Sequence, residues 1–78
     1  MQFKSFCKNQ REVAQTINDV IDSYWNANTS EQDMIAIIKK IYENNADKII
    51  KEGEFTKVLQ QQCGKKRLDV ISKIIEVK

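Results

Sequence analysis

Histidine and proline are absent from this 78-residue chain, and glycine and cysteine occur only twice each. The commonest general base is therefore missing, and two cysteines that form no CxxC pair cannot supply the four ligands of a structural zinc site. Without proline, and with glycine only at Gly53 and Gly64, the chain has few of the turn signals of an all-β protein. These absences favour helices joined by short turns, with no metal and no cofactor.

Long hydrophobic runs are absent as well. The longest unbroken apolar run, Met34 to Ile38, is far too short to span a bilayer. The first ten residues, MQFKSFCKNQ, lack the apolar stretch of a signal peptide. Cys7 and Cys63 are then expected to be reduced thiols. We therefore predict a cytoplasmic protein without a membrane partner, forming one helical domain over residues 1–78.

Helical periodicity is what the chain does contain. The clearest pattern predicts a helix from about Gln10 to Asn26, capped by Asn9 with Glu12 three residues later. The apolar stripe of this helix consists of Val13, Ile17, Val20, Ile21 and Tyr24.

The middle of the chain predicts two further helical segments. Ser30 is expected to cap a second helix, with acidic residues in its first turn and an end near Asn44-Asn45. A short segment over residues 46–52 follows, and we expect it to stop at Gly53 as the residue after the helix.

The most hydrophobic helix is predicted at the end of the chain, after Gly64. Its apolar side chains fill an arc of about 160° at 100° per residue. They are Leu68, Val70, Ile71, Ile74, Ile75 and Val77. Because a helix this apolar is expected to lie between others, the predicted fold is all-α. It is a compact bundle of four to five short helices with the C-terminal helix at its centre.

Charge is distributed unevenly along the chain. Residues 12–38 contain five acidic residues and no basic residue, whereas residues 54–78 contain six basic and three acidic residues. Residues 65–67 are three cations at the start of the final helix, where they oppose the helix dipole and would favour a bound phosphate. The candidate contacts for an anion or nucleic acid are Lys57, Lys65, Lys66, Arg67 and Lys73. Alternatively, the acidic and basic regions attract each other within the fold.

Other candidate chemistry is better explained structurally. Asp19 and Asp22 lie on the polar face of the first helix, as solvated carboxylates would. Cys63 precedes a glycine and three cations but has no base partner, and a buried cysteine is the commoner case. Gly64 lacks the earlier glycine and preceding strand of a phosphate-binding loop. The sequence therefore predicts a protein that is not an enzyme.

Three stretches carry a resemblance to a known family: QREVAQTIN, YWNANTSEQD and FTKVLQQQCGKKRLDVI. Together they resemble a family of short, uncharacterised single-domain proteins of clostridia and related bacteria. The resemblance covers nearly the whole chain and implies a stand-alone protein of about this length. It implies no activity, ligand or functional residue.

Two functions remain open from the sequence. The first is a non-enzymatic helical interaction module, binding an unknown protein partner or forming a homodimer through a seam of Val70, Ile74 and Val77. The same residues could instead be ordinary core. The alternative is a nucleic-acid-binding regulatory protein that uses the basic turn at residues 64–67.

Overall fold

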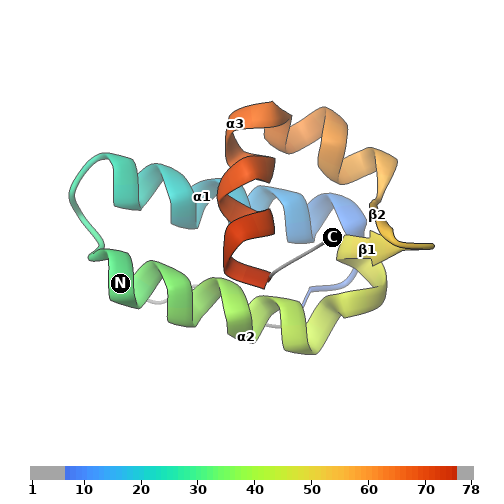
Figure 1. Ribbon diagram of the computed structural model, residues 1–78, viewed down its shortest axis with the longest axis horizontal. Coiled ribbons are helices and arrows are strands. Elements are labelled where there is room, and N and C mark those ends of the chain that lie inside the picture. The colour runs from blue at the N-terminus through green and yellow to red at the C-terminus, as the bar shows by residue number, and fades with distance from the viewer. Residues whose placement is uncertain (1–6, 76–78) are drawn as a thin grey trace.

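Three helices and one hairpin make up the fold of residues 7–75, the part of the chain that the computed structural model describes (Figure 1). The elements in order are α1 (Gln10–Trp25), α2 (Glu31–Ile49), β1 (Ile50–Lys51), β2 (Glu54–Phe55) and α3 (Lys57–Ile75). The prediction of a mostly helical protein is confirmed. The predicted count of four to five helices is wrong, because two expected breaks are bends within longer helices.

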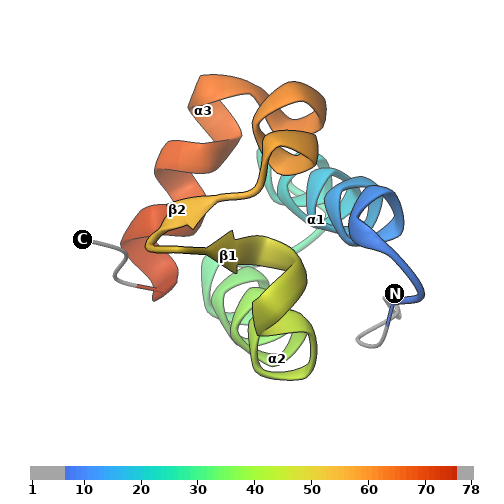
Figure 2. The ribbon, with the colours of Figure 1, turned by 90° about the vertical axis from the view of Figure 1, so that its right-hand side faces the viewer.

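The centre of the fold is α1, which packs against both α2 and α3 (Figure 2). In its apolar stripe, Val13, Ile17, Val20 and Ile21 have no exposed area, and neither has Ala14, whereas Tyr24 at the end of the helix is half-buried. In α3 only three side chains are buried: Leu59, Cys63 and Ile71. The prediction of a central C-terminal helix is therefore wrong. The C-terminal helix has a wide apolar arc because Ile71 faces the core, whereas Val70 and Ile74 line a groove that is described below.

Both predicted helix caps are confirmed. The Asn9 side chain accepts a hydrogen bond of 2.8 Å from the backbone N–H of Glu12. The Glu12 carboxylate reaches back and accepts from the N–H of Lys8 at 3.3 Å. At the start of α2, Ser30 Oγ accepts from the N–H of Asp33 at 3.1 Å. These contacts satisfy backbone donors that have no partner inside a helix.

The first bend lies in α2 at Asn45, whose φ and ψ of −136° and 30° leave the helical region. Its side chain is fully buried and bonds in two directions. The amide nitrogen donates to the carbonyl of Ile41 at 2.9 Å, and the amide oxygen accepts from the N–H of Cys7 at 3.1 Å. The helix then continues to Ile49, so the predicted end at Asn44-Asn45 is wrong.

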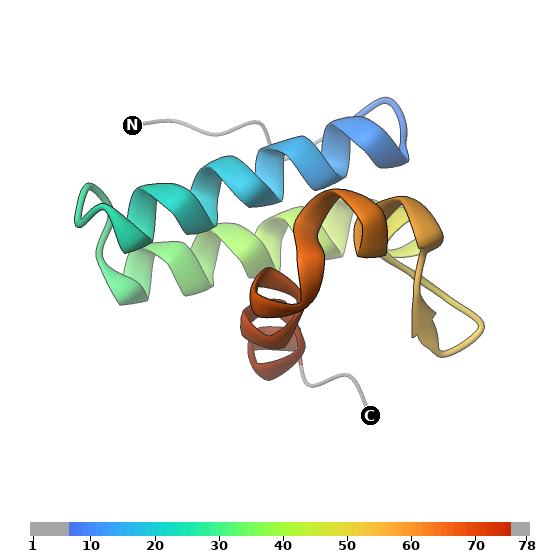
Figure 3. The ribbon, with the colours of Figure 1, turned by 90° about the horizontal axis from the view of Figure 1, so that it is seen from above.

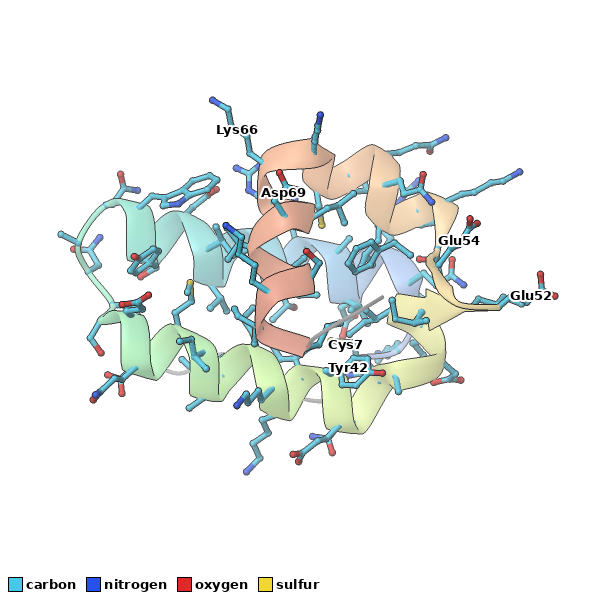
Figure 4. The ribbon with its side chains drawn as sticks, viewed as in Figure 1. Cys7, Tyr42, Glu52, Glu54, Lys66 and Asp69 are labelled. Carbon is cyan, nitrogen blue, oxygen red and sulfur yellow. The ribbon has the colours of Figure 1, made fainter. Side chains whose placement is uncertain are left out.

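The helical segment predicted over residues 46–52 is helical only to Ile49, as the end of α2, and a two-stranded hairpin replaces the rest. Ile50 pairs with Phe55 and Lys51 with Glu54 in antiparallel register. The two turn residues, Glu52 and Gly53, have positive φ values of 54° and 81°, as a type I′ turn requires. Gly53 is therefore a turn residue and not the end of a helix. Glu52 and Glu54 extend into solvent at this hairpin (Figure 4).

The second bend lies in α3 at Gly64, with φ of 78° and ψ of 168°. This region of backbone space is essentially restricted to glycine. Thr56 begins the helix, because its hydroxyl accepts from the N–H of Leu59 at 3.4 Å. After the bend, the C-terminal half of α3 (residues 65–75) turns away from α1 and runs across towards α2 (Figures 1 and 3).

Candidate functional site

The basic turn predicted as an anion site lies at the bend of α3, and its arginine is already engaged. Arg67 Nη2 lies 2.6 Å from Asp22 Oδ1, and its Nε donates to the same oxygen at 3.1 Å. The two residues are 45 positions apart, which joins α1 to the C-terminal half of α3. For Arg67, the alternative that acidic and basic regions attract each other within the fold is therefore confirmed.

Arg67 also stabilises the bend itself. Its Nη1 donates to the carbonyl of Cys63 at 3.2 Å, and its Cζ lies 5.4 Å from the centroid of the Trp25 ring. Asn18 Nδ2 donates to the neighbouring carbonyl of Gln62 at 2.9 Å. Both carbonyls belong to the residues just before the bend, so these two side chains supply hydrogen bonds at the point where the helix changes direction. The guanidinium thus serves a structural purpose (an ion pair, a helix cap and a cation–π contact).

Cys63 is not an activated thiol. Its side chain is 3% exposed, and its Sγ lies 3.9 Å from the carbonyl of Ala14. Burial raises the pKa of Cys63 from 9.0 to about 11, and the nearby charge of Arg67 lowers it only in part. The thiol is therefore protonated at neutral pH, as expected for a buried cysteine beneath a turn.

The four lysines of the predicted anion site do not share one cavity. Lys65 and Lys66 are exposed at the bend, and Lys66 extends away from the protein there (Figure 4). Lys57 lines a hollow beside the hairpin, together with Gln10 and Phe55. Lys73 lines a separate groove on the C-terminal half of α3. The five predicted residues thus lie in four environments: the exposed bend, the hollow beside the hairpin, the groove, and the internal pairing of Arg67.

A groove of about 370 Å³ lies where the end of α1 and the start of α2 meet the C-terminal half of α3. Its apolar lining consists of Tyr24, Met34, Ile35, Val70 and Ile74. Met34 is 3% exposed, whereas the other four side chains are half-buried. The groove forms because the bend at Gly64 carries the C-terminal half of α3 across the helix pair and not along it (Figure 3).

Charged side chains complete the lining of this groove. Lys39 comes from α2, Lys73 from α3 and Glu31 from the first turn of α2. All three are exposed, and none forms an ion pair or hydrogen bond with another residue of the described range 7–75. The groove therefore combines an apolar floor with two cations available to a ligand.

A second hollow, of about 350 Å³, adjoins the groove further along α2. It shares Lys39 and Ile74 with the groove and adds Tyr42, Glu43 and Ile75. Tyr42 lies on α2 near the end of α3 (Figure 4). The concave surface thus follows α2 from Glu31 to Glu43.

The predicted dimer seam falls in this groove for two of its three residues. Val70 and Ile74 line the groove side by side on one face of α3. Val77 lies outside the described residues. The sequence did not reveal the groove residues contributed by α1 and α2, namely Tyr24, Ile35 and Lys39. Ile35 was the available signal, because it follows Met34 directly and widens the apolar stripe of α2 beyond what one buried face needs.

Within residues 7–75 there is no group of three or more side chains suited to hold a metal ion. No helix among the described residues is long and apolar enough to cross a membrane.

The fold and the groove define a small helical protein built on a central helix, with a bent C-terminal helix that leaves an apolar groove open. The chain belongs to the family CLB_0814_fam, described as a conserved hypothetical protein, whose model matches residues 4–76. This match confirms the resemblance to a family of short uncharacterised proteins. Neither a curated protein nor a solved structure matches the chain.

Proposed function

We propose that this protein is a small, non-enzymatic protein–protein interaction module that binds its partner in the groove between α2 and the C-terminal half of α3. The observation that carries the proposal is the groove's lining: four half-buried apolar side chains beside two lysines without partners in the described range. In a small protein, apolar side chains left together at an open surface commonly mark a contact site.

The nucleic-acid alternative has less support. Arg67, the side chain best suited to phosphate and guanine, is occupied by Asp22 and the carbonyl of Cys63. Lys65 and Lys66 alone supply two phosphate contacts, which gives a weak affinity and a log–log slope against salt of only about −1.8. Lys57 lies at a different hollow and does not add to them.

Site-specific photo-crosslinking in cells that carry the native gene tests the proposal. A photoreactive amino acid at Ile35, inside the groove, should form a discrete crosslinked species. The matched control places the same amino acid at Gln61, which is exposed on α3 and lines none of the grooves described above. A crosslink of twice the protomer mass identifies a homodimer, and any other discrete mass identifies a different partner. Equal yields at the two positions, or no species at Ile35, would refute the proposal.

A further inference from the structure

We infer that the groove binds an acidic amphipathic helix of another protein. This inference rests on the proposed function and adds the chemical class of the partner. It follows from the dimensions of the concave surface, from its charge, and from the poor match of the groove to a second copy of the chain.

The dimensions suit a short helix. Between Glu31 and Glu43 the surface follows α2 for twelve residue steps, or roughly 18 Å at a rise of 1.5 Å per residue. That length corresponds to about three turns, the usual length of a helix bound in a groove by its i, i+3, i+4 and i+7 side chains. The apolar side chains on the floor provide contacts for such a stripe.

The charge specifies what must flank that stripe. Lys39 lies on the α2 side of the groove and Lys73 on the α3 side, and Lys39 also lines the adjoining hollow. Neither lysine has a partner within residues 7–75. A helix with Glu or Asp on both sides of its apolar stripe places a carboxylate near each lysine. Glu31 and Glu43 lie at the two ends of the concave surface, where each disfavours an acidic residue in the partner, and the two lysines flank the stretch between them.

A second copy of the chain is a poor occupant. In a symmetric dimer the same patch meets itself, so two grooves that each carry two lysines and one glutamate face one another. A head-to-tail arrangement would need an exposed acidic amphipathic helix, and α1 is the acidic helix. The exposed carboxylate of Asp19 on α1 lies among polar side chains such as Gln15, with no exposed aliphatic residue beside it.

Two designed peptides provide the probe. Each has about 14 residues and the same leucine stripe; glutamates flank the stripe in one peptide, and lysines in the other. Titrated into the full-length protein and followed by amide shifts in NMR, the glutamate peptide should bind and shift Met34, Ile35, Val70 and Ile74. The lysine peptide should bind at least about tenfold more weakly, because two attractive pairs become repulsive.

A matched pair of variants makes the test specific. The double substitution Lys39→Glu and Lys73→Glu should lower the affinity for the glutamate peptide by about tenfold and raise the affinity for the lysine peptide. Lys65→Glu with Lys66→Glu makes the same change in net charge outside the groove and should alter either affinity by less than about twofold. All four lysines are exposed, so both variants should keep the helical circular dichroism of the parent.

Three results would overturn the inference: no binding of the glutamate peptide, equal binding of both peptides, or equal loss in both double variants. A protein that dimerises through the groove at the working concentration would also overturn it. A crosslink at Ile35 does not depend on the charge of the partner. If the crosslink forms but the glutamate peptide does not bind, the acidic helix is rejected as the partner, and the proposal of an interaction module is retained.

Discussion

Helices α2 and α3 each contain one bend, and the two bends are stabilised in different ways. At Asn45, the residue itself leaves the helical region and one buried side chain bonds both to its own helix and to Cys7. At Gly64, the backbone adopts a conformation that favours glycine, and the side chains of Asn18 and Arg67 donate to the two carbonyls before it. The first bend therefore depends on a single amide group, whereas the second is supported by several partly exposed contacts.

This difference predicts which substitutions should destabilise the fold most. A buried polar group that loses its partner is not compensated by water, but an exposed one is. Asn45 has no exposed area, while the side chains of Arg67 and Asp22 are 28% and 45% exposed. We therefore expect the effects of substitution to decrease from Asn45, through Gly64, to the ion pair.

The largest effect is expected for Asn45→Ala. The substitution leaves the buried N–H of Cys7 without this acceptor and removes the bond to Ile41. The free energy of unfolding measured in urea should therefore fall by about 3 kcal/mol. Lys40→Ala, at an exposed position of the same helix, is the control and should change the free energy of unfolding by less than about 0.5 kcal/mol. Equal effects for the two variants would show that the Asn45 amide does not hold the first bend.

Gly64→Ala should have an intermediate effect of about 2 kcal/mol in the same urea measurement. Apart from the chain neighbours and the nearby backbone of α3, no atom lies within 4 Å of an added Cβ, so the expected cost comes from the positive φ. Chemical synthesis gives a decisive control for a 78-residue chain, namely D-alanine at position 64. A D-residue favours this backbone conformation and should preserve or increase stability. If L-alanine and D-alanine have the same effect, backbone strain is not what shapes the second bend.

The smallest effect is expected for Asp22→Asn, which removes the charge of the ion pair but keeps an oxygen that can accept from Arg67. Because both partners are partly exposed, the loss should be below about 1 kcal/mol at low salt. It should shrink further at high salt, where exposed charges are screened. Asp19→Asn is the control, since Asp19 bonds Gln15 and forms no ion pair within the described range. A loss that does not depend on salt would mean that hydrogen-bond geometry, and not charge, accounts for the contact.

The features predicted well from sequence are those encoded within a few residues. The caps at Asn9 and Ser30 and the stripe of α1 follow from spacing alone, and all are present. The hairpin was missed because its strands are two residues long and Glu52 is an unusual residue for a positive φ. Short apolar runs such as Ile49-Ile50 also fit a helix as well as a strand.

The candidate site was less predictable, because it depends on contacts between distant parts of the chain. The pairing of Arg67 with Asp22 spans 45 positions, and no local pattern distinguishes it from a free basic turn. The groove depends on the direction that α3 takes after Gly64. The sequence indicates a possible helix break at this glycine but not the angle between the two halves of the helix. Val70 and Ile74 were singled out as part of a possible dimer seam and do line the groove, but their neighbours across it could be found only from the fold.

Trp25 has a practical consequence. It is the single tryptophan of the chain, it is 48% exposed, and the Arg67 guanidinium lies over its ring. Its fluorescence emission therefore reports one contact, that between the end of α1 and the C-terminal half of α3, without any added label. Far-UV circular dichroism averages over all three helices, so a difference between the two signals would reveal local detachment of that half-helix before the fold is lost.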